Sequence, residues 1–151
     1  MRRTRLTVAL VAAGVAAVAG LALAAPHPAA GACQTRAGGA LPDPRCTPGL
    51  ADPALGRAQL CPHLGPAVIR KVSQATKDAV RTAYADHTPG EIDHLISLEL
   101  GGSNDQRNLW PQDGPVPNTK DAVENRLHAA VCAGTITLAA AQHQIATDWR
   151  H

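Results

Sequence analysis

The chain has no phenylalanine, and its 151 residues include only one tyrosine and two tryptophans. Aromatic side chains bury more apolar area than other residues, so the core of this protein must be built from alanine, valine, leucine and isoleucine. The shortage also excludes an extended aromatic surface on which the bases of a single-stranded nucleic acid would stack. A small domain with such a core needs stabilisation from another source.

Charged residues are missing from a long run near the start of the chain. Residues 6–25 are apolar and rich in alanine, and the preceding MRRTR holds three arginines. This arrangement is typical of a secretory signal peptide, with small residues at 22–25 for cleavage. The alternative is a single membrane anchor, because about 20 residues at roughly 1.5 Å each just span a bilayer core of ~30 Å. The alanine and glycine content favours cleavage. We therefore expect residues 1–25 to be removed and the protein to be secreted, outside the cell or in the periplasm or envelope, without stable membrane association.

The mature chain also lacks an excess of positive charge. Removal of Arg2, Arg3 and Arg5 leaves 11 of the 14 basic residues against 12 acidic ones, a net charge of about −1. Any contact with nucleic acid must then depend on a local patch. The candidates are Lys77, Arg81 and Arg107, although Lys77 and Arg81 also fit the solvated face of a helix.

Four cysteines provide the stabilisation that the core lacks. Cys33, Cys46, Cys61 and Cys132 form an even set in an exported chain, and each disulfide would contribute about 2 to 4 kcal/mol. Of the three possible connectivities, we favour Cys33–Cys46 as a local loop and Cys61–Cys132 as a long cross-link. Two alternatives stay open, a metal cluster of Cys61, His63 and Cys132 and a lipid attached at Cys33. The first lacks the paired C-x-x-C spacing of zinc sites.

The remaining sequence predicts an α+β fold with one domain. Residues 26–65 are rich in proline, glycine and alanine and form a loop-rich arm, whereas residues 66–151 carry the periodic segments. The patterns predict a helix over 73–85, short strands within 91–100 and 107–110 joined by an irregular loop, a helix over 119–133 that begins after Asn118 and ends at Gly134, and a helix over 137–150.

Several polar residues follow this strand, loop, strand, helix order. They are the Asp93-His94 pair, the Gly101-Gly102 pair, Asn108 before Leu109, and Asn118 ten residues later. This set resembles the HNH nucleases, whose ββα-metal motif holds one divalent cation between a hairpin and a helix. The motif covers Glu91 to Cys132. A broader likeness to small exported bacterial proteins with HNH-like domains extends from Cys46 to Trp149.

The resemblance implies a role for each matching residue. His94 would be the general base, since a neutral imidazole with a pKa near ~6.5 can accept a proton from water. Asp93 and Asn118 would be metal ligands, with His128 as the second choice after Asn118, and Asn108 would hold the loop and orient the base. Oxygen ligands favour Mg²⁺ or Mn²⁺ over Zn²⁺. Because successive strand residues point to opposite faces, Asp93 and His94 share a site only if the strand ends or bends there.

The resemblance is incomplete. Ser97 stands where the family commonly has proline, the C-x-x-C zinc knuckles are absent, and the third position is asparagine instead of histidine. Asn118 also fits a simple helix cap, Asp93-His94 a buried polar turn, and His128 a surface partner of Glu124. We expect a monomeric, metal-dependent endonuclease that acts on DNA or RNA. The alternative is a non-catalytic secreted module that keeps the scaffold to bind a partner or the cell envelope.

Overall fold

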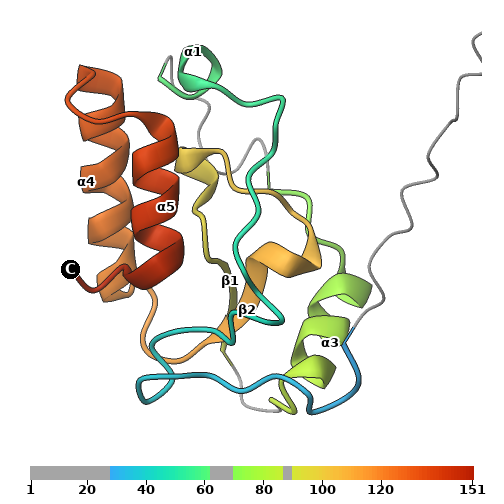
Figure 1. Ribbon diagram of the computed structural model, residues 1–151. Coiled ribbons are helices and arrows are strands. Elements are labelled where there is room, and N and C mark those ends of the chain that lie inside the picture. The colour runs from blue at the N-terminus through green and yellow to red at the C-terminus, as the bar shows by residue number, and fades with distance from the viewer. Residues whose placement is uncertain (1–27, 62–69, 87–89) are drawn as a thin grey trace, which may run out of the picture.

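The computed structural model describes residues 28–61, 70–86 and 90–151 (Figure 1). The predicted signal peptide, residue His63 and the first two residues of the arm lie outside this part of the chain. Among the described residues, no helix is both long enough and apolar enough to cross a membrane.

In these three described ranges the fold combines helices with a two-stranded antiparallel sheet, which confirms the predicted α+β class. Helices α4 and α5 lie side by side and contact each other, while α3 contacts strand β2 on another side of the hairpin (Figure 1). The elements in chain order are α1 (Arg57–Leu60), α3 (Gln74–Ala83), β1 (Glu91–His94), the 3₁₀ turns η1 (Leu98–Leu100) and η2 (Gln106–Asn108), β2 (Leu109–Gln112), α4 (Thr119–Ala133) and α5 (Leu138–Asp148).

The ends of helix α4 follow the predicted signals. The Asn118 side chain accepts a hydrogen bond from the Lys120 N–H, and the Asp121 carboxylate accepts one from the Asn118 N–H, which completes a capping box. Gly134 ends the helix with φ of 77°, a left-handed conformation that glycine adopts without steric cost. These caps fix where α4 starts relative to the hairpin.

The first strand of the hairpin lies within the predicted segment, and the second extends beyond it. Strand β1 ends at His94, because the next residues turn into η1 and do not continue the ladder to residue 100. Strand β2 continues through Pro111, which pairs with Ile92, although the prediction ended this strand before the proline. In a two-stranded sheet each strand has an open edge, so the missing proline N–H leaves no partner unsatisfied.

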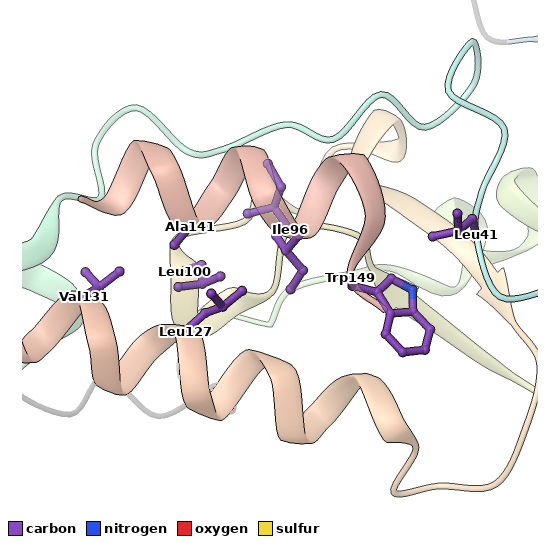
Figure 2. Packing of buried hydrophobic residues seen from close by; sticks show 8 residues of the cluster. Leu41, Ile96, Leu100, Leu127, Val131, Ala141 and Trp149 are labelled. Carbon is purple, nitrogen blue, oxygen red and sulfur yellow. The ribbon is translucent and has the colours of Figure 1, made fainter. Parts of the chain in front are cut away.

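The main core lies between α4, α5 and η1 (Figure 2). Trp149 follows α5 and donates from its indole Nε1 to the Ala40 carbonyl at 2.8 Å, so the loop-rich arm is attached to this core. Leu100 and Ile145 have no exposed surface. The buried members of the cluster are Leu41, Ile96, Leu100, Leu127, Val131, Ala141, Ile145 and Trp149.

Both disulfides have the predicted connectivity. Cys33–Cys46 closes a loop within the arm, and Cys61–Cys132 joins the residue after α1 to helix α4. The two bonds connect the arm to itself and to the helical layer, which is the stabilisation that the small aliphatic core requires.

Candidate functional site

A small polar cavity of about 40 Å³ lies where β1 ends. Residues of β1 and η1 form one side, helix α4 supplies Glu124, and Arg70 lies at the exposed margin. A cavity of this volume can hold a water molecule or a small ion. Its lining residues are Arg70, Asp93, His94, Ser97, Leu98, Glu99 and Glu124.

The end of the strand places Asp93 and His94 at the same cavity. Asp93 is 7% exposed and His94 is 1% exposed, and the chain turns at Leu95 directly after them. Two side chains that would point to opposite faces of a longer strand therefore line one cavity. This is the bend that the sequence analysis required for a shared site.

The double glycine makes the following turn possible. A Cβ atom on Gly102 would lie 1.7 Å from the Ile96 carbonyl oxygen and 2.9 Å from Asn108 Nδ2. Gly101 has φ of 74°, in the left-handed region where side chains are disfavoured. The loop therefore closes tightly around the Asn108 side chain because both positions lack a Cβ.

Asn108 is completely buried and holds this loop with its carboxamide. Its Oδ1 accepts hydrogen bonds from the N–H of Ile96 at 2.9 Å and of Leu50 at 3.2 Å. Its Nδ2 donates to the carbonyls of Ile96 and Ser103, both at 3.0 Å. One side chain thus satisfies four backbone groups that no strand ladder pairs, and it fixes the residues that follow His94.

The hydrogen bonds around His94 determine its tautomer. Asn104 Oδ1 accepts the Lys71 backbone N–H at 3.2 Å, which identifies this atom as the amide oxygen. His94 Nε2 lies 3.1 Å from the same oxygen, so Nε2 carries the proton and donates it. The Nδ1 atom is buried and has no hydrogen-bond partner among the described residues. Nδ1 is therefore an available proton acceptor.

Burial keeps the His94 imidazole neutral. Desolvation lowers the pKa of His94 to about 4, against the opposing effect of the hydrogen bond with Asn104. The Ser97 hydroxyl and Glu99 Oε2 are also buried and have no hydrogen-bond partner in the described part of the chain, and both residues line the same cavity. Three orphaned polar atoms in one cavity are unusual, because buried polar groups normally have a hydrogen-bond partner or ordered water.

Lys120 lies on the α4 side of Asp93 and was not predicted as a site residue. Its side chain has no exposed surface, and its Nζ donates to Asp93 Oδ2 at 2.8 Å, to Glu124 Oε1 at 2.5 Å and to the His94 carbonyl at 2.6 Å. Burial opposes the charged form, but the carboxylates of Asp93 and Glu124 outweigh it and raise the pKa of Lys120. The ammonium is therefore charged and fully bonded.

The Glu124 carboxyl at the cavity is harder to ionise than an exposed glutamate. Burial raises its pKa to about 7, although the Lys120 ammonium favours the charged form. The same effect, with the nearby Asp93 charge, raises the pKa of Glu91. A further cation at this cavity would therefore stabilise the ionised form of the carboxyl groups that border it.

The two predicted alternatives for the third ligand lie elsewhere. Asn118 Oδ1 caps helix α4, and its residue borders a separate cavity of about 440 Å³ together with Gln112 and Trp149. His128 Nε2 lies 3.2 Å from the Leu60 carbonyl and 3.4 Å from Cys132 Sγ. The structure places Asp93 and His94 at one cavity, and Asn108 holds the backbone of Ile96 just after them. Neither Asn118 nor His128 is among the residues that line this cavity.

The predicted phosphate-contacting residues lie in ion pairs or on the nearby helix. Arg81 pairs with Asp86 at 3.3 Å and donates to the Gly90 carbonyl, and Arg107 pairs with Asp105 at 2.9 Å. Lys77 lies on α3. A positive group that the sequence analysis did not select is Arg70, which lines the cavity and lies 3.6 Å from Glu91.

Some of the missed residues carried a recognisable pattern. Lys120 and Glu124 are four apart on a predicted helix that starts near the motif, so an ion pair between them was predictable. The burial of Lys120 and Glu124 against Asp93 could not be predicted, because it depends on how α4 packs on the hairpin. Asn104 and Glu99 lie in the loop, where sequence periodicity gives no information about side-chain direction.

No family model matches the chain, and searches of curated proteins and of solved structures find no match either. The resemblance to HNH nucleases therefore stays a prediction from the motif residues.

Proposed function

We propose that the protein is a secreted, metal-dependent, HNH-like endonuclease that hydrolyses phosphodiester bonds of DNA or RNA. The observation that carries this proposal is the His94 imidazole, which is neutral, held at Nε2 and open at Nδ1 in a cavity bordered by carboxylates. A fixed proton acceptor beside cation-attracting groups is the combination that phosphodiester hydrolysis requires.

His94 would remove a proton from the attacking water through Nδ1. The hydrogen bond from Nε2 to Asn104 fixes the ring, and the Asn108 network fixes the backbone after it. Because the pKa of His94 is lowered to about 4, the imidazole is ready to accept a proton at neutral pH, although it is a weak base. The Ser97 hydroxyl lines the same cavity and can hold the water in place.

The residues present fit a hard divalent cation in chemical type. Asp93, Glu99 and Glu124 offer carboxylate oxygens at one cavity, and Glu99 Oε2 has no other partner among the described residues. Three carboxylates outnumber the two cations at the site, Lys120 and Arg70, when all are charged. A bound Mg²⁺ or Mn²⁺ would neutralise charge on the phosphate and its leaving oxygen. Asn118 remains a predicted ligand, and Glu99 and Glu124 join it as candidates.

The substrate would approach from the side of Arg70. The Arg70 side chain is 38% exposed and lines the margin of the cavity, so its guanidinium can contact a phosphate without leaving the site. Arg81 and Arg107 would have to exchange their aspartate partners for phosphate oxygens. This predicts weak, salt-sensitive binding of nucleic acid.

The test is nicking of a supercoiled plasmid, and cleavage of a labelled RNA, by the oxidised protein with Mg²⁺, Mn²⁺ or EDTA. We expect cleavage with metal and none with EDTA. Removing the base in His94→Ala should lower the rate by about 10²-fold or more. His143→Ala, at an exposed position of α5, is the matched control and should cleave normally. Full activity of a folded His94→Ala protein would contradict the proposal.

The Lys120 ammonium favours a second candidate, the non-catalytic module. It already pairs with both Asp93 and Glu124, as an internal counterion does in a purely structural site. Among the described residues, neither carboxylate belongs to a group of three His, Cys, Asp or Glu side chains that could hold one ion. A folded protein that neither cleaves nucleic acid nor binds Mn²⁺ would support this candidate.

A further inference from the structure

A second group of ligand-type side chains, none of which lines the cavity, belongs to helix α4 and to the residue after α1, the two contacting helices labelled in Figure 1. Cys61, His128 and Cys132 each offer one ligand atom, and these atoms all lie within 4.8 Å of one another. His128 and Cys132 are four residues apart on α4 and so share a helix face, with the two atoms 3.4 Å apart. All three residues are partly exposed, which gives an ion access.

We propose that these three residues bind one zinc ion when the Cys61–Cys132 disulfide is reduced. A reductant with two thiols, or a phosphine, supplies the two electrons that break the S–S bond, and two protons convert the sulfurs to thiols. Zinc then displaces these two protons and binds two thiolates and the His128 imidazole, leaving one coordination position for water. The inference is independent of the proposed nuclease activity.

The spacing of the donors suits tetrahedral zinc. With Zn–S near 2.3 Å and Zn–N near 2.0 to 2.1 Å, the edge of a tetrahedron between sulfur and nitrogen is about 3.5 Å. The observed separation of Cys132 Sγ and His128 Nε2 is 3.4 Å. Two thiolates on the same ion would be about 3.8 Å apart by the same geometry. Side-chain rotation of Cys61 can provide this separation once the covalent bond is broken.

The site does not depend on the disulfide alone for its assembly. Arg57 of α1 donates from Nε to the Val131 carbonyl at 2.8 Å and from Nη2 to the Cys132 carbonyl at 2.5 Å. These bonds hold α1 against the end of α4 after reduction. Zinc binding requires His128 Nε2 to present its lone pair, so Nδ1 must then carry the proton. The contact between Nε2 and the Leu60 carbonyl is therefore lost when zinc binds.

The ligand type separates this site from the cavity beside Asp93. Thiolate and imidazole favour zinc, whereas carboxylate oxygens favour magnesium or manganese. The Cys33–Cys46 bond provides an internal comparison, because no histidine belongs to a three-ligand group with it among the described residues. Reduction of both disulfides should therefore create one zinc site and not two.

The test titrates Zn²⁺ into the full chain, reduced with a phosphine in the absence of oxygen, against a chromophoric chelator. We expect one zinc per chain, a thiolate-to-metal absorption band with Co²⁺, and a higher melting temperature of the reduced protein with zinc. His128→Ala should weaken zinc binding at least tenfold, and Cys61→Ser should do the same. Cys33→Ser is the matched control and should bind as the wild type does.

Three results would overturn the inference. The first is equal zinc affinity in the wild type, His128→Ala and Cys61→Ser proteins. The second is zinc binding without a rise in the melting temperature, which would mean that unfolded chain binds the ion. The third is equal loss of binding in Cys33→Ser and Cys61→Ser, which would place the ion elsewhere.

Discussion

Lys120 Nζ lies 2.8 Å from Asp93 Oδ2, and the lysine side chain has no exposed surface. Its other two hydrogen bonds go to Glu124 and to the carbonyl of His94. The ammonium therefore joins helix α4 to the last two residues of β1. The buried Lys120 ammonium thus holds the carboxylates of Asp93 and Glu124 next to each other.

Replacing this lysine by methionine should destabilise the protein strongly. Lys120→Met keeps the length of the side chain but leaves Asp93 and Glu124 without their buried counterion. Removal of one partner of a buried ion pair costs about 3 to 5 kcal/mol. Urea unfolding with EDTA measures the loss, and Lys77→Met on α3 is the control. A loss below about 1 kcal/mol, the range of exposed pairs, would show that the ammonium does not hold this site together.

The same variant tests whether the cavity binds a divalent cation. The Lys120 ammonium repels a metal ion that would share Asp93, so its removal should increase Mn²⁺ affinity. We expect Mn²⁺ to raise the unfolding free energy of Lys120→Met more than that of the wild type, as linkage requires. An equal rise in both proteins, or none, would place any bound metal away from Asp93.

Asn108 and Asn118 should differ in their contribution to stability, although both were predicted as site residues. Asn108→Ala removes four hydrogen bonds, two of them buried, and leaves backbone groups of Ile96 unpaired, at a cost of about 3 to 4 kcal/mol. Asn118→Ala removes a helix cap worth about 1 kcal/mol. Chemical denaturation of the two variants measures both losses. Equal losses would refute the role assigned to the Asn108 network.

The sequence predicted those features of the fold that depend on local patterns. The caps at Asn118 and Gly134 and the aliphatic faces of α4 and α5 follow from residue type and helical spacing. The end of β1 at His94 does not follow from such local patterns, because residues 95–100 are mostly apolar and suit a buried strand as well as a buried turn. Asn108, twelve residues from Ile96, decides between them by taking the backbone groups that a ladder would use.

The candidate site was predictable only in part for the same reason. Asp93 and His94 were found from the motif, and the bend at His94 was required by their chemistry. Lys120 was not predicted, because it belongs to helix α4, which is remote in sequence from Asp93. Its burial results from the packing of α4 on the hairpin. Ser97, noted only as a departure from the family pattern, lines the cavity, and its buried hydroxyl has no partner within residues 28–61, 70–86 and 90–151.

Gly102 should tolerate no larger residue. A Cβ at this position would lie 1.7 Å from the Ile96 carbonyl, so the turn around Asn108 must open. We expect Gly102→Ala to cost several kcal/mol, about the range of severe overpacking. Gly90→Ala is the control, because its Cβ would lie 3.5 Å from the nearest backbone atom, an ordinary contact. Thermal unfolding compares the two, and similar melting temperatures would contradict the close approach.

His94 and Glu124 should give the metal-free protein opposing pH dependences. Folding lowers the pKa of His94 from 6.5 to about 4, so the unfolded chain binds more protons between these values and stability rises with pH. Folding raises the pKa of Glu124 from 4.5 to about 7, so the folded chain binds more protons there and stability falls as pH rises. Between about pH 4.5 and 6.5 the two effects oppose each other in the wild type.

Single substitutions should separate the two effects. Glu124→Gln removes the Glu124 contribution and keeps that of His94, so its unfolding free energy should increase from pH 4.5 to 6.5, by about 2 to 3 kcal/mol at most for a shift of this size. His94→Gln removes the His94 contribution and keeps that of Glu124, so its unfolding free energy should decrease over the same interval. Glu91, whose pKa burial also raises, is present in both variants and acts in the same direction as Glu124. Urea unfolding at several pH values, with EDTA present, measures both slopes. If the two variants had slopes of the same sign, the imidazole would not be buried in its neutral form, and His94 would lose the property on which its role as a base depends.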